Sequence, residues 1–318
     1  MLFTALLLSA VLNGPASAAT YPDRPVRLIA PIAVGGLTDT LARLVAAGLA
    51  DSLGQPVVVE NKPGAGGIIG MEAAAKAAPD GYSLILVYQG VAAVNASLYP
   101  KLPYDTLRDF TPIAGLGSFP LVLVTHPGSG IHSVNNLLRQ ARNDPDALSY
   151  ASAGNATTSH LTMELFKNDA GIQAMHVPYK GEGPANTDVA GGQVDIAFSS
   201  LASVAPLIKS GRLVALGIAT RERSPMLPGV PTISEAGLSG FEAAGWYALL
   251  APAGTPSEVV QTLSRAVAGV LGRPETSAKL EALGVTAKAT PPAELDRQIR
   301  SETEKWKAVI QQSHITLN

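Results

Sequence analysis

The sequence predicts an α/β protein of two lobes, with a helical C-terminal segment that returns to the first lobe. Short apolar runs of strand length alternate along the chain with helical patterns, as in mostly parallel sheets that are covered by helices. The 318 residues suffice for about two domains, each large enough to bury its own core. The 31 Gly and 24 Pro, set against only 5% aromatic residues, indicate many short loops between small-residue elements.

The first lobe shows this alternation from residue 25 to residue 87. Its expected strands are 26–30, 57–59 and 84–87, with 57–59 taken as a buried strand. Between the first two strands, apolar residues recur at spacings of three and four, which predicts one buried helix face: Leu41, Leu44, Val45, Leu49 and Leu53. A small-residue helix at 70–78 ends in the turn Pro79-Asp80-Gly81.

A second alternating series begins with the strand 121–125 and ends with the strand 213–219. Between them the pattern predicts helices at 134–142, 158–168, 183–190 and 203–210, and strands at 149–151, 174–177 and 194–198. A further strand at 246–251 leads into three C-terminal helices, 257–271, 274–283 and 292–313. Each of these helices opens with Pro or Ser, as helix starts prefer.

Composition excludes several classes of function. A net charge of −2 without a run of Lys or Arg argues against a nucleic-acid groove or a polybasic membrane patch. The absence of cysteine removes disulfides, thiolate metal sites and cysteine nucleophiles. With 47% apolar and 15% charged residues, the chain also lies far from the composition of disordered proteins.

Residues 1–18 have the features of a signal peptide. They carry no charge, and the apolar stretch from Leu2 to Leu12 is too short to span a bilayer. The stretch ends at Gly14-Pro15, and small residues of the kind that a signal peptidase recognises follow at 16–18. We therefore expect export and cleavage near Ala18/Ala19, although no Lys or Arg follows Met1. The alternative is a buried N-terminal helix.

The glycine-rich loop at 64–70 invites comparison with a dinucleotide-binding loop. Ile69, however, stands where the third glycine of that fingerprint belongs, and Asp80 sits in a turn rather than at the end of a strand. Close packing of a helix against a tight loop explains these glycines better, and we expect no nucleotide and no other cofactor.

Catalytic and metal-binding motifs are missing from the sequence. It contains no G-x-S-x-G, S-x-x-K or H-E-x-x-H, and no two histidines have the helical spacing of metal ligands. We therefore expect neither an enzyme nor a metal site. A triad assembled in space, as in an exported α/β hydrolase, remains the alternative. The five histidines are His126, His132, His160, His176 and His314.

Two polar, glycine-containing loops open helices, one in each lobe: residues 31–39 (PIAVGGLTD) and 152–160 (SAGNATTSH). A helix N-terminus offers unpaired N–H groups and partial positive charge, so it binds carboxylate or phosphate without a cationic side chain. Ordinary capping is the alternative, with Thr38 or Asp39 as N-cap and Asp39–Arg43 as an i,i+4 pair. Because each lobe has such a loop, we favour an anion site between the lobes.

A dense, ordered set of motifs runs from Tyr21 to the C-terminus. The motifs are 22–26 (PDRPV), 35–43 (GGLTDTLAR), 59–67 (VENKPGAGG), 78–82 (APDGY), 104–105 (YD), 108–110 (RDF), 160–161 (HL), 164–166 (ELF), 177–181 (VPYKG), 191–195 (GGQVD), 227–232 (LPGVPT), 235–237 (EAG) and 250–256 (LAPAGTP). With these motifs the chain resembles the Bug/TctC family, the periplasmic solute receptors of tripartite tricarboxylate transporters.

The resemblance implies a two-lobed periplasmic-binding-protein (Venus flytrap) fold, each lobe a mostly parallel sheet flanked by helices, that closes on a small organic carboxylate. It implies lobe 1 at 19–122, lobe 2 at 123–243 and a return to lobe 1 at 244–318. The implied receptor is periplasmic and monomeric, and it delivers its ligand to the membrane subunits of the transporter. A sensor that presents the ligand to a signalling partner would share the same pocket.

The resemblance also implies a set of ligand-binding residues. In the first lobe these are Gly35, Gly36, Thr38, Asp39, Gln89 and Gly90. In the second lobe they are Ser152, Gly154, Asn155, Thr157, Thr158, His160, Tyr179, Lys180, Gly181 and Ser199. The sequence departs from the family pattern at Ile32-Ala33-Val34, where an aromatic and two prolines are usual, at Ala156 and at Ser199. These departures leave the identity of the carboxylate open.

Overall fold

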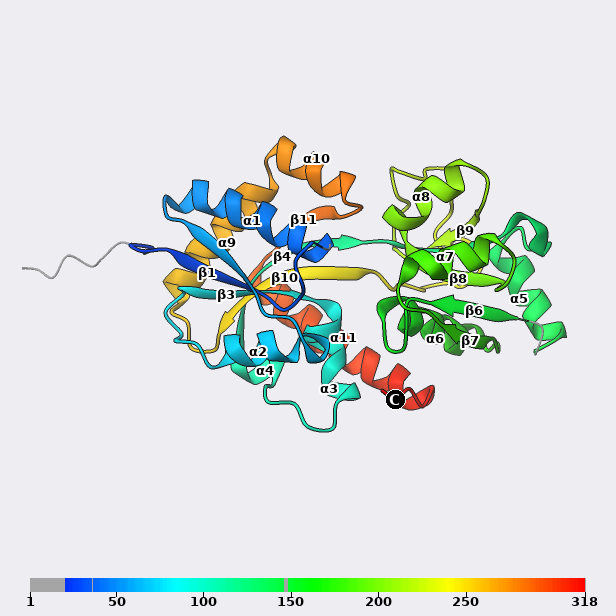
Figure 1. Cartoon of the computed structure of the whole chain (residues 1–318), viewed down its shortest axis with the longest axis horizontal. Coiled ribbons are helices and arrows are strands. Elements are labelled where there is room, and N and C mark those ends of the chain that lie inside the picture. Colours follow the sequence, from blue (N-terminus) through cyan, green and yellow to red (C-terminus); the bar gives the residue numbers. More distant parts are fainter. Residues whose placement is uncertain (1–20, 36, 146–147, 318) are drawn as a thin grey trace, which may run out of the picture.

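The computed structural model describes residues 21–35, 37–145 and 148–317. The predicted signal peptide, 1–18, and the predicted site residue Gly36 therefore lie outside the described residues. Figure 1 shows two α/β lobes side by side, joined by the long strands β4 and β10. The chain passes from the first sheet to the second at Pro120, so the predicted boundary after residue 122 falls inside a strand.

The first lobe contains a six-stranded sheet in the order β11-β4-β10-β3-β1-β2. Its strands are β1 (Val26–Ala30), β2 (Val57–Asn61), β3 (Ser83–Tyr88), β4 (Phe110–Phe119), β10 (Gly245–Pro252) and β11 (Thr286–Thr290). Its longer helices are α1 (Leu37–Leu53), α2 (Ile68–Ala75), α9 (Ser257–Leu271), α10 (Pro274–Ala282) and α11 (Pro292–Gln312). Short helices follow β3 and precede β4: a π-helix at Gly90–Val94, α3 (Asn95–Leu98) and α4 (Thr106–Asp109).

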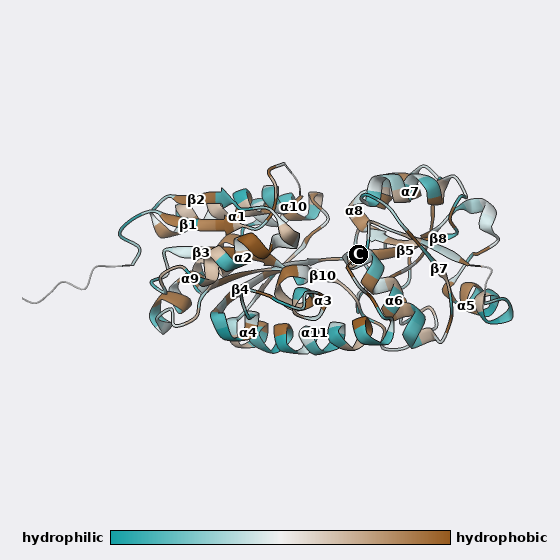
Figure 2. Cartoon of the chain, turned by 60° about the horizontal axis from the view of Figure 1, so that its bottom comes forward, coloured by the Kyte–Doolittle hydropathy of each residue, from teal (hydrophilic) through white to brown (hydrophobic). Residues whose placement is uncertain are grey.

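Alternate residues of the central strands fill two cores. Leu28 and Leu84 pack in the core beneath α1 and α9, whereas their neighbours Ile29 and Ile85 pack in the core that α2 and α11 cover. Both faces of the sheet are therefore buried, which explains why these strands are apolar runs rather than alternating patterns. Figure 2 shows the same division, with apolar strands inside and polar outer faces on the helices.

The second lobe contains a five-stranded sheet in the order β7-β6-β8-β5-β9. The strands are β5 (Leu121–Thr125), β6 (Ser149–Ser152), β7 (Met175–Pro178), β8 (Ile196–Ser200) and β9 (Val214–Ile218). The helices are α5 (Val134–Asn143), α6 (Thr158–Ala170), α7 (Glu182–Ala190) and α8 (Leu201–Lys209).

Both sheets are mixed rather than mostly parallel, which corrects the expectation for each lobe. β1 is parallel to β2 and β3, but β10 is antiparallel to β3 and β4. In the second sheet β6 is parallel to β7 and β8, but β5 is antiparallel to β8 and β9. The cause is the crossing between lobes, because a strand that enters a sheet from the other lobe begins at the edge where the βα strands end.

This topology brings the carboxyl ends of most strands to the space between the lobes. β4 leaves the first lobe and β10 enters it, so β1, β2 and β3, which run opposite to β10, end at that edge. β5 enters the second lobe, so β6, β7 and β8 end at its facing edge. The loops that follow these strands therefore face one another, which is where open α/β sheets bind ligands.

The long C-terminal helix α11 connects the two lobes. It packs on β4 and on α6 of the second lobe, and its carboxylate Glu302 accepts hydrogen bonds from Gln89 (2.6 Å) and from the Trp306 indole (2.7 Å). Beyond it, the Asn168 amide donates to the Ser313 hydroxyl over 3.1 Å. Figures 1 and 2 both place the C-terminus beside α6. No helix in the described part of the chain is long and apolar enough to cross a membrane.

Three strands differ from the sequence prediction. β2 is a half-exposed edge strand rather than a buried one. β4 and β11 were not expected, because β4 contains glycines that normally mark turns. A Cβ at Gly115 would lie 2.7 Å from the Cβ of Thr290, and one at Gly117 would lie 2.4 Å from the carbonyl oxygen of Thr286. The two glycines are therefore required by close contact with β11.

Candidate functional site

A cavity of about 290 Å³ lies between the lobes, where the loops at the two edges meet. The first lobe contributes Gly66, Tyr88, Gly90, Val94, Asn95, Leu98 and Tyr99. The second lobe contributes Asn155, Ala156, Thr157, Thr158 and Leu161, and Leu317 of the C-terminal tail completes the wall. None of these described residues carries a charged side chain. An anion in the cavity would therefore be held by neutral donors.

The N-terminus of α6 opens onto this cavity. Thr157 is its N-cap residue, but no side-chain oxygen accepts a hydrogen bond from the first N–H groups of the helix. The Thr157 hydroxyl instead donates to the carbonyl oxygen of Gly154 over 2.7 Å. Uncapped N–H groups at a helix start, with the partial positive charge of the helix dipole, form a binding site for a carboxylate.

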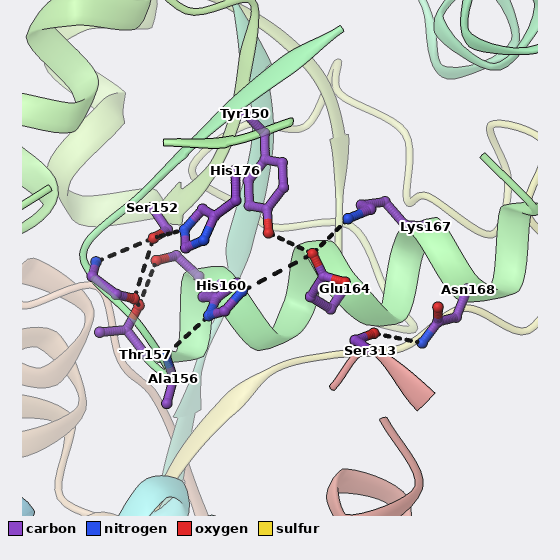
Figure 3. Close-up of polar contacts among 12 residues, drawn as sticks. Tyr150, Ser152, Ala156, Thr157, His160, Glu164, Lys167, Asn168, His176 and Ser313 are labelled. Atoms are coloured by element: carbon purple, nitrogen blue, oxygen red, sulfur yellow. Dashed lines mark hydrogen bonds and ion pairs between the residues drawn. The ribbon is translucent and has the colours of Figure 1, made fainter. Parts of the chain in front are cut away.

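The loop before α6 is held in place by a buried imidazole (Figure 3). The N–H of Ala156, a residue with a positive φ of 58°, donates to Nδ1 of His160 over 2.9 Å. The His160 ring stacks on that of His176, with centroids 4.0 Å apart, and Nε2 of His176 lies 2.6 Å from the Ser152 hydroxyl. His160 thus positions the loop rather than facing the cavity, since only 6% of the residue is exposed.

Burial keeps the His160 ring neutral. Burial, followed by the neighbouring His176, lowers the pKa of His160 to about 4. Burial opposes the ionisation of Glu164, but hydrogen bonds from Lys167 (2.7 Å) and from the Tyr150 hydroxyl hold its pKa below the usual value. A neutral ring is required because Nδ1 must accept the Ala156 N–H.

In the first lobe, Asp39 organises the loop that precedes α1. Its carboxylate accepts hydrogen bonds from the Gly35 N–H (3.0 Å), from the Asn61 amide (2.9 Å) and from the Arg43 guanidinium (3.0 and 3.1 Å). The bond from Asn61, then those from Gly35 and Arg43, hold the pKa of Asp39 at about 2. The structure therefore directs Asp39 and the Gly35 N–H toward each other and not toward a ligand. The Asp39–Arg43 pair of the capping alternative is present.

The other predicted residues of the first lobe are distributed between the cavity and the core. Gly90 lines the cavity, whereas the neighbouring Gln89 is 2% exposed, and its amide donates to Glu302 and to the Ala244 carbonyl. The Thr38 hydroxyl lies 3.4 Å from that of Tyr247 on β10. Gln89 thus joins the lobe to α11, and Thr38 joins the start of α1 to the sheet.

The second-lobe residues beyond α6 are placed in the same mixed way. The Tyr179 hydroxyl turns back to Asp188 (2.7 Å), and the Gly181 N–H donates to the Ala153 carbonyl (3.0 Å). Lys180 is exposed. Ser199 is 2% exposed and donates to the Asn186 side chain, so its hydroxyl points into the lobe.

Sequence reasoning missed much of the cavity wall. Tyr88 is the last residue of β3, and the rule that ligands meet the carboxyl ends of strands could have identified it. Val94 and Leu98 lie on short helices that have no sequence signal, and Tyr99 directly follows α3. Leu317 reaches the cavity only because α11 extends to the second lobe. The described residues contain no group of three His, Cys, Asp or Glu side chains that could hold a metal ion.

Comparison with known proteins agrees with this arrangement. The sequence model of the tripartite tricarboxylate transporter family receptor matches residues 41–315. Protein BugT of Bordetella pertussis is 39% identical over 96% of this chain and 94% of its own length. The structure of Rhodopseudomonas palustris Rpa4515 with adipate is 36% identical, covers 93% of this chain and 99% of its own, and has a TM-score of 0.77. The malate-bound MatC of the same organism is 35% identical over 91% of this chain and its whole length, with a TM-score of 0.73.

Proposed function

Because the chain belongs to the tripartite tricarboxylate transporter receptor family, we propose that it is an extracytoplasmic receptor for a small organic carboxylate. The ligand binds between the two lobes, and the lobes close around it. The proteins with 35–36% identity were solved with adipate and malate, both small carboxylates, which supports this ligand class.

The observation that carries the proposal is the uncapped start of α6 in a cavity shared by both lobes. The first turn of α6, which begins at Thr158, brings the free N–H groups, while Tyr88, Leu98 and Tyr99 supply a largely apolar opposite wall. This combination fits a ligand with a carboxylate at one end and a hydrocarbon body. Because each wall belongs to a different lobe, closure would bury the body and leave the carboxylate on the helix dipole.

The receptor would act outside the cytoplasm and with a membrane partner. The uncharged segment 1–18 supports export, with cleavage near Ala18/Ala19, and the family supports delivery to the membrane subunits of a tripartite tricarboxylate-type transporter. We propose a monomer in the periplasm. Deletion of the gene should abolish uptake of the acid that the protein binds, whereas a sensor would leave uptake intact and alter gene expression.

The hydrolase alternative has little support in the geometry. The described chain does bring a serine and a histidine together, Ser152 and His176, with 2.6 Å between Oγ and Nε2. Ser152 is only 1% exposed, however, and its hydroxyl also bonds to the N–H and the carbonyl of Gly154. A nucleophile must reach its substrate, so this pair stabilises the loop instead.

A thermal-shift screen tests the proposal. A ligand that binds only the folded state adds about 2.7 kcal/mol to the free energy of unfolding at 100 times its Kd. We expect small mono- or dicarboxylates to raise the melting temperature and neutral sugars to leave it unchanged. Stabilisation by sugars without any effect of acids would contradict the proposal.

A further inference from the structure

A second carboxylate, that of Glu182, lies at the interlobe edge of the second lobe. Glu182 is the first residue of α7, and its Oε1 accepts the backbone N–H of Ser200 over 3.1 Å. Its Oε2 accepts the Ser200 hydroxyl. Ser200 ends β8 and is the N-cap residue of α8, so one carboxylate serves the starts of two helices.

Glu182 therefore occupies the place at α8 where an external anion would be held. Its partners are neutral, and it forms no ion pair with any Lys, Arg or His in the described part of the chain. Lys180 lies two residues earlier but is exposed and is not bonded to it. A negative charge thus remains at this edge without a cationic side chain to neutralise it.

Glu182 does not line the cavity, but it is linked to both of its walls. The N–H of the preceding residue, Gly181, bonds to the Ala153 carbonyl, which ties it to the loop that opens α6. Across the cleft, the Glu182 charge contributes, after burial, to raising the pKa of Tyr247 in the first lobe. Tyr247 is the register partner of Tyr88, and Tyr88 lines the cavity.

The α8 start itself reaches the first lobe. A Cβ placed on Gly284, in the loop before β11, would lie 2.7 Å from the Cβ of Ala202. Ala202 is two residues beyond Ser200, so the Glu182–Ser200 contact lies where the two lobes already meet. A ligand that extends from α6 toward this contact would bring its far end near the Glu182 carboxylate.

We propose that Glu182 determines ligand specificity by disfavouring an anionic group at the end of the ligand away from α6. Monocarboxylates whose far end is neutral or cationic then bind more tightly than dicarboxylates of the same length. This inference depends on the proposed function, because it presumes that one carboxylate binds at α6. The physical cause is repulsion between like charges in a cleft from which water is partly excluded.

Three six-carbon acids test the proposal by calorimetry: hexanoate, ε-aminohexanoate and adipate. Wild-type protein should bind at least one of the first two more tightly than adipate. Glu182→Gln keeps the shape of the side chain and removes the charge, so it should shift the affinity ratio of adipate to hexanoate by about tenfold toward adipate, or about 1.4 kcal/mol. If Glu182 had only a structural role, Glu182→Gln would weaken the binding of all three acids by a similar factor.

Glu258→Gln is the matched control. Glu258 also lies in the first turn of a helix, but it is exposed and follows the end of β10 that points away from the second lobe. Glu258→Gln should leave the affinity ratio of adipate to hexanoate unchanged. Tighter binding of adipate by the wild type, or an unchanged ratio in Glu182→Gln, would overturn the specificity role while leaving the receptor function standing. Failure of all three acids to bind either protein would overturn the specificity role, whereas the receptor function is tested separately by the thermal-shift screen.

Discussion

The N–H of Ala156 donates to Nδ1 of His160 over 2.9 Å, so a buried imidazole fixes the loop that opens α6. The donor and the acceptor are separated by four positions in the sequence. The imidazole ring that accepts the bond packs against His176 and Tyr150. The free N–H groups at the start of α6 are therefore positioned by a histidine that does not itself face the cavity. Two predictions concern this loop.

The first concerns pH. The unfolded chain protonates His160 near pH 6.5, whereas the folded protein holds its pKa at about 4. Between these values the unfolded state binds more protons, so the free energy of unfolding falls as the pH falls. The loss attributable to His160 should reach as much as about 3 kcal/mol near pH 4. Urea unfolding at pH 7 and at pH 4.5 measures it.

His160→Asn is the control for that experiment. The Asn oxygen replaces Nδ1 as acceptor but does not titrate, so the variant should lose less stability than the wild type over the same interval. His176 and Glu164 remain in both proteins, so the difference between the proteins reports His160 together with its coupling to these two groups. Equal losses in the two proteins would show that His160 is not the group responsible.

The second prediction concerns Gly154, whose φ of +133° suits glycine alone and whose Cβ would lie 3.2 Å from the Tyr179 carbonyl oxygen. Gly154→Ala should cost about 1–3 kcal/mol of strain. It should also displace Thr157 and weaken acid binding by about tenfold in calorimetry. Gly171→Ala, at the C-terminus of the same helix and with open space around it, should lower stability without changing affinity. Equal affinities of Gly154→Ala and wild type would contradict the role of this loop.

The third prediction concerns Lys180, which is exposed at the end of β7 and has no ion-pair partner among the described residues. If neutral N–H groups hold the carboxylate, Lys180→Ala should weaken binding by about tenfold at most, through a screened charge at the rim. The remaining effect should shrink as salt is added. Complete loss of binding in Lys180→Ala would instead indicate a cationic pocket.

Much of this architecture could be predicted from the sequence, because the buried strands and helices have clear periodicity. The bounds of α9 and β5 agree with the predicted 257–271 and 121–125. β4 and β11 could not be predicted, since their glycines are required by a contact between strands that are far apart in the sequence. Local patterns also could not show that the sheets are mixed, because strand direction depends on how the chain crosses between lobes.

The site was predictable as a region but not residue by residue. The loop at 152–160 was located by its glycine and polar residues before a helix, and Asn155, Thr157 and Thr158 line the cavity. Gln89, in contrast, is buried between the cavity residues Tyr88 and Gly90. Ser199 is a buried strand residue, and an error of one position along a strand reverses the face to which a side chain points. No sequence motif indicated that Glu182 lies near the site, because its position depends on the contact of α7 with Ser200.

The most direct test of the account is calorimetry of an acid ligand on Thr157→Asp, with Ser133→Asp as control. An Asp at the N-cap of α6 places the protein's own carboxylate on the N–H groups that we assign to the ligand, and should raise stability by up to about 1 kcal/mol. Ser133 is the N-cap of α5, which follows the end of β5 that points away from the cleft. We predict that Thr157→Asp loses acid binding by about a hundredfold or more, while Ser133→Asp binds like the wild type. Undiminished binding by a stably folded Thr157→Asp would show that the carboxylate is held elsewhere.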